Sequence, residues 1–414
     1  MTNDLRIGSF KGLYNTPVQE LIILFLLNCP AFITDLLIIY HSGYDYAGGE
    51  FANLSYNYTL FGLIISVWGI FAYKKRLRIV NMYLILLLVL CKDGILHLLG
   101  SPTPFSLNSW ELYLSPIYAM SCCVIVANYE HNANELNRFL DWLIIINFIY
   151  QILFLMTGRV MDSGRVSVIG QGVVSVGYMC ALHIMHILLT RKLNLYCICI
   201  IIISFLSILL SGTRFCLFFV IIGSIVFAKH ILMSIEIKKR KTIIITFLFI
   251  VCLIGILLSS STIATQFESV NRISSLTDGN TLENISQDQS LLERIHSIMV
   301  GFEILADYPL GVANSYVILQ GYTIDYGFFA FPHSNLLTYY LLWGIPFLFC
   351  VAWLFRTMAL SFRTRQGGVG RMMIYIIVCF AIYGGIETSV KSYVYIFALF
   401  SVYKRQILES SQQI

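Results

Sequence analysis

Long apolar runs separated by short polar segments recur along the whole chain. Most of them approach about 20 residues, the length at which an α-helix crosses the hydrocarbon core of a bilayer. The pattern predicts an all-α integral membrane protein with about twelve transmembrane helices. The predicted spans are 21–41, 57–73, 79–98, 112–129, 139–157, 168–190, 194–211, 214–233, 242–261, 334–355, 372–387 and 391–403.

Composition supports the same class of protein. The 414-residue chain is 58% hydrophobic and only 12% charged, against about 25% charged residues in soluble domains. The first 20 residues are mostly polar, and no small-residue cleavage site follows the run at 21–41. We interpret that run as a retained first helix and not as a signal peptide. All eleven cysteines lie inside apolar runs, which argues against both a disulfide framework and a cysteine-based metal site.

The distribution of lysine and arginine predicts the orientation of the chain. With a cytoplasmic N-terminus, all but seven of the 27 basic residues fall in segments on the inner side. The opposite orientation would place most of them outside, against the positive-inside rule. We therefore expect both termini to lie in the cytoplasm. The formal net charge of +5 gives no indication of a nucleic-acid partner.

The basic residues that do not fall on the inner side are mostly arginines. Lys92 lies within a predicted span, and the other six map to the outer side: Arg159, Arg165, Arg214, Arg272, Arg294 and Lys391. A planar guanidinium can bind two phosphate oxygens at once, whereas an ammonium acts as a point charge. This set suggests an anionic ligand at the outer face. The alternative is ordinary snorkelling of long side chains to the membrane surface.

One segment outside the spans is long, at residues 262–333, and it divides the chain into 1–261, 262–333 and 334–414. Within it, Ser290 and Glu293 have the spacing of a capping box. Apolar residues then recur at helical spacing, which predicts an amphipathic helix over about 291–306 lying against the top of the bundle. The apolar stripe comprises Leu291, Ile295, Ile298, Phe302 and Leu305. Arg294 lies off this stripe, where it is available to a ligand or simply solvated.

Two predicted spans begin with residues that can do chemistry at the outer face. Gly212 ends one span, and Arg214 opens the next after a link of two or three residues. The free N–H groups and dipole of a helix N-terminus favour anions. His333, between Pro332 and Asn335, stands at the start of another span. A neutral imidazole there can accept a proton from a hydroxyl near pH 7, although a lone histidine at a helix end is more often structural.

Three motifs occur in a characteristic order. The stretch "HSNLLTYYLLWG" fits a pattern of His, then Asn, Ser or Gln, then nine residues and Gly, through His333, Ser334 and Gly344. The stretch "SGTR" at 211–214 fits a small-residue-and-arginine start of a transmembrane helix. The stretch from Arg294 to Val312 fits an arginine followed by a proline–glycine stretch in a large periplasmic loop. Together they resemble the O-antigen ligase and polymerase superfamily, over about 200–360, and most closely its Wzy-type polymerases.

The resemblance implies a GT-C-like, metal-independent and cofactor-free glycosyltransferase of the bacterial inner membrane, whose active site faces the periplasm. Its donor and acceptor would be undecaprenyl-pyrophosphate-linked oligosaccharides, and a polysaccharide chain-length regulator would be a further partner. Under this hypothesis Arg214 and Arg294 bind the diphosphate, and His333 activates the acceptor hydroxyl. The expected substrate-binding residues are Arg272, Arg159, Arg165, Lys391 and Asn335.

Two alternatives remain open from the sequence. A ligase of the same superfamily would use the same donor and transfer the glycan to lipid A-core. A flippase for lipid-linked oligosaccharides would also have about twelve spans, but it is expected to place charges along a central cavity and to have short loops. The charged residues within the spans are few and include Asp35, Lys92 and Asp93. A structural ion pair to other helices is the favoured interpretation of Lys92 and Asp93.

Overall fold

The computed structural model describes residues 80–99, 133–156, 165–166, 173–234, 289–312, 332–364, 366–382 and 390–411. Within these ranges the regular structure is entirely α-helical and no strand is present, so the all-α prediction is confirmed. The helices are α3 (Val80–Leu98), α5 (Ala133–Met156), α6 (Val173–Thr190), α7 (Leu195–Ser211), α8 (Arg214–Val226), α9 (Ala228–Ser234), α14 (Gln289–Asp307), α16 (Asn335–Trp343), α17 (Ile345–Arg363), α18 (Gly367–Ile382) and α19 (Val390–Ser411). The spans predicted at 21–41, 57–73, 112–129 and 242–261 lie outside the described residues.

Several of these helices have the length and composition of membrane spans. Leu136–Met156, Val173–Thr190 and Ile345–Arg363 are each long and apolar enough to cross a bilayer. Leu195–Ser211, Phe215–Val226 and Gly367–Ile382 are apolar but shorter. The described part of the chain is therefore that of a helical membrane protein.

Helix α6 is the centre of the bundle. It packs against α5, α7, α8, α18 and α19, and almost all of its residues are buried. Its sequence is consistent with this position, because α6 is largely apolar all round and carries no Asp, Glu, Lys or Arg. Gly177 allows the turn between α7 and α8 to approach α6 closely, since a Cβ at this position would collide with the Thr213 hydroxyl.

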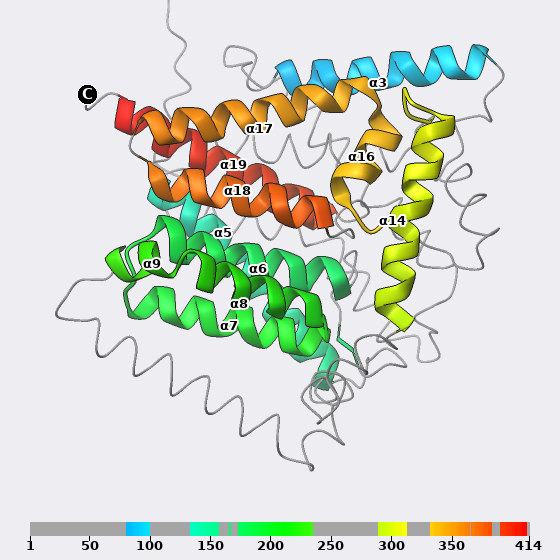
Figure 1. Cartoon of the computed structure of the whole chain (residues 1–414). Helices are drawn as coiled ribbons and strands as arrows, with labels where there is room; N and C mark the ends of the chain where they lie inside the picture. The colour runs from blue at the N-terminus through cyan, green and yellow to red at the C-terminus, as the bar shows by residue number, and fades with distance from the viewer. Residues whose placement is uncertain are drawn as a thin grey trace, which may run out of the picture.

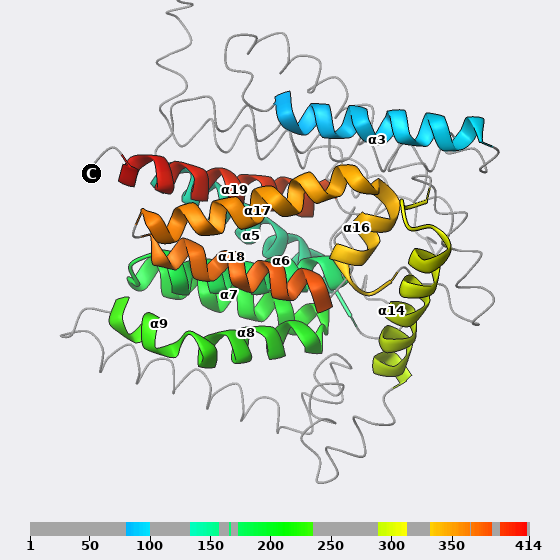
Figure 2. The ribbon, with the colours of Figure 1, turned by 45° about the horizontal axis from the view of Figure 1, so that its top comes forward.

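The bundle has two distinct ends (Figure 1). Helix α14 lies across one end, transverse to the bundle helices, and it keeps that place in the second view (Figure 2). We call this the α14 end and the opposite one the α9 end. The described ends of α5, α6 and α19 at the α9 end carry a group of basic residues: Arg138, Arg191, Lys192, Lys404 and Arg405.

Helix α14 has the predicted extent but not the predicted inner face. It covers Gln289–Asp307, so Ser290 lies inside its first turn and is not the N-cap. The predicted apolar stripe is only partly correct: Ile298 and Leu305 pack against the core, whereas Ile295 is 47% and Phe302 59% exposed. The buried face is formed instead by Ser297, Val300, Gly301 and Ile304. Small residues on this face allow the close approach: a Cβ at Gly301 would come within 2.5 Å of Leu337 Cδ2 and 3.0 Å of the Pro332 ring.

The span predicted at 334–355 is also wrong as a single helix. Helix α16 ends at Trp343, and α17 begins at Ile345 in a different direction (Figure 1). Gly344 breaks the chain with a φ of 63°, a conformation that glycine adopts without strain. Pro346 then occupies the first turn of α17, where its missing N–H costs no hydrogen bond. The apolar run is continuous in sequence, but the helix within it is interrupted at Gly344.

Two further boundaries differ from the sequence prediction. The span predicted at 214–233 is divided into α8 and α9, which meet at Phe227. The short span predicted at 391–403 is a helix of 22 residues, α19, that continues to Ser411. Apolar composition ends before this helix does, because its last turns carry charged residues on the side away from the bundle.

Candidate functional site

The turn between α7 and α8 at the α14 end is as short as predicted. Helix α7 ends at Ser211, Gly212 closes it in the left-handed conformation (φ 63°), and α8 begins at Arg214. The Gly212 N–H donates to the Leu209 carbonyl, and the hydroxyls of Ser211 and Thr213 lie 2.6 Å apart. The position of Arg214 at the start of α8 is described, but its side chain is not.

Arg165 reaches the same turn from the segment that precedes α6. Its Nε donates to the Ser211 carbonyl over 2.9 Å, and the next residue, Val166, donates its N–H to the Leu210 carbonyl over 2.9 Å. These two contacts satisfy carbonyl groups at the C-terminus of α7, which have no partner within that helix. Arg165 is therefore both a cap for α7 and a cation beside the N-terminus of α8.

Arg294 reaches the first turn of α8 from the other side. Its Cζ atom lies 4.6 Å from the centroid of the Phe215 ring, so the guanidinium stacks on the residue that follows Arg214. Contacts of this kind orient a guanidinium while leaving donors in its plane for other acceptors. Arg294 is half-buried and faces the bundle.

Ser297 links His333 to the turn of α14 that carries Arg294. The His333 N–H donates to Ser297 Oγ over 3.1 Å, and that hydroxyl donates to the Arg294 carbonyl over 2.8 Å. The next residue, Ser334, is the N-cap of α16 and accepts from the Leu337 N–H. Within the described residues, no hydrogen bond to the imidazole ring itself is present, so its nitrogens can face a ligand. We call Arg294, His333 and the first turn of α8 the Arg294–His333 site.

The electrostatic environment keeps His333 neutral. Burial, and then the positive charge of Arg294, lower the pKa of His333 from 6.5 to about 4. At pH 7 the ring is therefore uncharged and has one nitrogen that can accept a hydrogen bond. Because Arg294 contributes to this shift, a change in the charge near Arg294 also changes the pKa of His333.

Asn335 follows in the first turn of α16. It is fully buried, and neither atom of its amide group has a hydrogen-bond partner. Buried amides are almost always satisfied in folded proteins, and an exception calls for a specific explanation. An amide beside Ser334 with unused donor and acceptor capacity is suited to a polar ligand, and substrate binding by Asn335 stays a prediction.

The remaining predicted residues are not placed in the site. Arg159 and Arg272 lie outside the described residues. Lys391 is the second residue of α19, and only its backbone is described. Within the described ranges, no group of three or more His, Cys, Asp or Glu side chains has the arrangement of a metal site.

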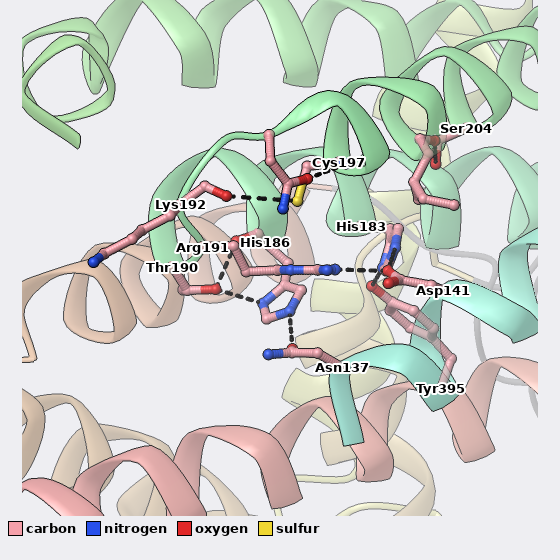
Figure 3. A network of polar contacts seen from close by, with 12 residues as sticks. Asn137, Asp141, His183, His186, Thr190, Arg191, Lys192, Cys197, Ser204 and Tyr395 are labelled. Carbon is pink, nitrogen blue, oxygen red and sulfur yellow. Dashed lines mark hydrogen bonds and ion pairs between the residues drawn. The ribbon is translucent and has the colours of Figure 1, made fainter. Parts of the chain in front are cut away.

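A second polar cluster, which the sequence analysis missed, lies inside the bundle toward the α9 end (Figure 3). His183 on α6 joins Asp141 on α5 (Nε2 to Oδ1, 3.0 Å) and Tyr395 on α19 (Nδ1 to the hydroxyl, 3.0 Å). Arg191, just after α6, donates to the same Asp141 oxygen over 2.7 Å. The other carboxylate oxygen, Asp141 Oδ2, is buried without a hydrogen-bond partner.

One turn further along α6, the same three helices repeat the arrangement without a charge. His186 joins the Asn137 amide oxygen on α5 over 2.8 Å and the Tyr403 hydroxyl on α19 over 3.0 Å. The Thr190 hydroxyl also lies 3.0 Å from His186 Nδ1. We call these two layers, with Arg191, the Asp141 network. Its histidines, tyrosines and aspartate are fully buried.

The sequence does contain a signal for this network. Asn137 and Asp141 are four residues apart, and His183 and His186 are three apart, so each pair shares one helix face. Polar residues on one face of an otherwise apolar helix usually face the interior of a membrane bundle. What the sequence does not indicate is that α5 and α19 lie on the same side of α6.

Comparison with known proteins finds no family model and no curated protein that matches this chain. The family resemblance of the three motifs stays a prediction.

Proposed function

We propose that this protein is a surface-polysaccharide polymerase of the O-antigen type, which joins lipid-diphosphate-linked oligosaccharides at the outer face of a bacterial inner membrane. The observation that supports it best is the Arg294–His333 site. A cation and a neutral imidazole lie together at a helix N-terminus, at the end of the bundle opposite a group of basic residues. An anionic leaving group and a hydroxyl nucleophile are the reactants such a pair can serve.

The chemistry assigned to the site is displacement at an anomeric carbon. The acceptor hydroxyl attacks that carbon, and the bond from the carbon to the phosphate oxygen breaks, so the lipid diphosphate leaves with the electron pair. Arg294 and the first turn of α8 stabilise the negative charge that develops on the diphosphate. His333 accepts the hydroxyl proton and afterwards releases it to solvent. A diphosphate beside Arg294 offsets its charge, which raises the pKa of His333 and makes it a better base.

Arg294→Lys is expected to lower kcat by about tenfold to a hundredfold, which corresponds to the loss of one charge-assisted hydrogen bond. A lysine keeps the charge but lacks the planar fork that stacks on Phe215 and binds two oxygens at once. The measurement is chain extension by purified protein supplied with native lipid-linked repeat units. Arg138→Lys, an exposed arginine at the α9 end, is the matched control and should remain active. Equal activity of Arg294→Lys and the wild type would contradict the proposal.

The pH dependence of kcat/KM should have its acidic limb near pH 4 and not near 6.5. His333 must be neutral to accept a proton, and its pKa in the free protein is about 4, so activity falls only as pH drops through that value. Arg294→Gln removes the second cause of the lowered pKa, so the limb of its residual activity should move to higher pH. An acidic limb at the same pH in both proteins would show that Arg294 does not act on the essential base.

A deletion strain distinguishes the polymerase from the ligase alternative. Loss of a polymerase leaves one repeat unit attached to the lipid A-core and removes the longer chains, which is the expected result on a polysaccharide gel. Loss of a ligase leaves no repeat unit attached to the lipid A-core, and that result would favour the ligase reaction over the polymerase reaction. Complementation with the wild-type protein restores the ladder in either case.

The Asp141 network favours a second candidate, a proton-coupled transporter of lipid-linked oligosaccharides. Chains of buried Asp, His and Tyr with an adjacent Arg are typical of proton pathways in transporters, and Asp141, His183 and Arg191 form such a chain here. The two functions differ in a simple assay with a defined lipid-linked substrate. Only the polymerase lengthens the glycan, whereas the transporter moves it across a vesicle membrane without changing it.

A further inference from the structure

Lys92 of α3 has an unusual position for a lysine in an apolar helix. Its side chain is only 15% exposed, and its Nζ atom has three oxygen neighbours. It donates to the Val312 carbonyl over 2.6 Å and to the Leu342 carbonyl over 2.5 Å, and it lies 3.0 Å from Asp93 Oδ1. An ammonium has three N–H donors, so each donor has an acceptor. The adjacent Lys92 and Asp93 do pair, and Lys92 also binds the backbone of two other segments.

The two carbonyls lie in segments next to the Arg294–His333 site: one in the chain that leaves α14 and one in α16. Val312 follows the C-terminal end of α14, and Leu342 lies in the last turn of α16. The Val312 N–H also donates to the Leu341 carbonyl over 2.7 Å, and the Tyr340 hydroxyl donates to the Pro309 carbonyl over 2.8 Å. The chain leaving α14 is thereby fixed to the C-terminal end of α16.

Two glycines make this contact possible. Gly311 and Gly344 both have positive φ angles, 88° and 63°. A Cβ at Gly344 would collide with the Leu310 carbonyl oxygen and would come within 3.2 Å of Lys92 Cδ. A Cβ at Gly311 would lie 2.7 Å from the Leu341 carbonyl oxygen. Gly344, the last residue of the motif that begins at His333, is thus where α14, α16 and the Lys92 side chain meet.

A displacement at this contact would be transmitted to the site, because α14 runs from one to the other. From Arg294 to Asp307 the helix is about 20 Å long at ~1.5 Å per residue, so a tilt of about 10° at the C-terminal end would move Arg294 by about 3 Å. A misplacement of about 1 Å can cost about a hundredfold in rate. Without the ammonium, the Val312 and Leu342 carbonyls would lose their charged donor in an apolar environment, and the chain leaving α14 would be held to α16 only by the Val312–Leu341 and Tyr340–Pro309 hydrogen bonds.

We propose that Lys92 is a positioning residue for the Arg294–His333 site, which it orders by tying the C-terminal ends of α14 and α16 together. We call Lys92 with Gly311, Val312, Leu342 and Gly344 the Lys92 joint. This inference rests on the proposed function for its catalytic consequence, but its structural consequence can be measured without any substrate.

The test uses Lys92→Met, which keeps the length of the side chain and removes its donors. In the full chain, spin labels at two exposed positions, Met299 on α14 and Phe349 on α17, report the distance between the helices by pulsed electron resonance. We expect Lys92→Met to broaden or shift this distance distribution and to lower kcat by about tenfold or more. Lys229→Met, on α9, is the matched control and should change neither. Lys92→Gln, which keeps two neutral donors, is measured if Lys92→Met does not accumulate.

A second readout reports on the contact between Arg294 and His333, and the distance distribution shows whether α14 is still folded against the bundle. If α14 tilts away, Arg294 withdraws from His333, and the pKa of His333 should rise from about 4 toward its ordinary value in a histidine NMR titration. An unchanged distance distribution and an unchanged His333 titration in the Lys92 variant overturn the inference. A changed distance in a protein whose wild type extends no glycan would reject the proposed function and leave the Lys92 joint standing.

Discussion

Replacing His333 with alanine is expected to abolish polymer ladders while the protein still accumulates in the membrane. A positioned general base contributes about 10²–10⁴ to a rate, and no described hydrogen bond gives the imidazole ring a structural task. The backbone N–H that binds Ser297 survives the substitution, so α14 should keep its place against α16. The measurement combines a polysaccharide gel of the complemented deletion strain with quantification of the protein in membranes.

The matched control is His296→Ala. His296 lies on α14, one residue before Ser297, and it is exposed. It removes an imidazole from the same helix turn without touching the Arg294–His333 site, and it should leave the ladder unchanged. A full ladder from His333→Ala, at the protein level of the wild type, would remove this histidine from the mechanism.

Features determined by neighbouring residues were predictable from the sequence. Gly212 ends α7 because it adopts the left-handed conformation (φ 63°), which glycine tolerates best. Arg214 opens α8 because the apolar run resumes there. His333 precedes α16 because Ser334 can cap it and Pro332 cannot continue a helix. Each of these boundaries depends on backbone preferences that act over three or four residues.

Features that depend on contacts between distant segments were not predictable. The inner face of α14 is defined by Gly301, which fits against Pro332 and Leu337, and not by the larger apolar residues that the periodicity favoured. The break at Gly344 was hidden in the same way, since its partners are Leu310 and Lys92.

Asp141→Asn is expected to destabilise the protein by about 3–5 kcal/mol, the usual cost of removing one member of a buried ion pair. Asp141 is fully buried and balances the charge of Arg191, which donates to it over 2.7 Å. Asparagine has nearly the same shape, so the loss reflects the charge and not a cavity. The measurement is the free energy of unfolding in mixed micelles. Glu409→Gln is the matched control, because the Arg405–Glu409 pair is 44% and 42% exposed and such pairs contribute about 0.3–0.5 kcal/mol.

A double variant tests whether the loss comes from the charge. Combining Asp141→Asn with Arg191→Met removes both charges, so no ion remains buried without a partner. The combined destabilisation should therefore be smaller than that of the two single variants added together, by about 0.5–3 kcal/mol. Additive effects would instead mean that Asp141 acts only through its contact with His183, as a neutral polar residue between helices would. Such interhelical contacts contribute about 0.6 kcal/mol on average in membranes. A destabilisation of about 3–5 kcal/mol by Asp141→Asn would therefore come from the ion pair and not from the hydrogen bond alone.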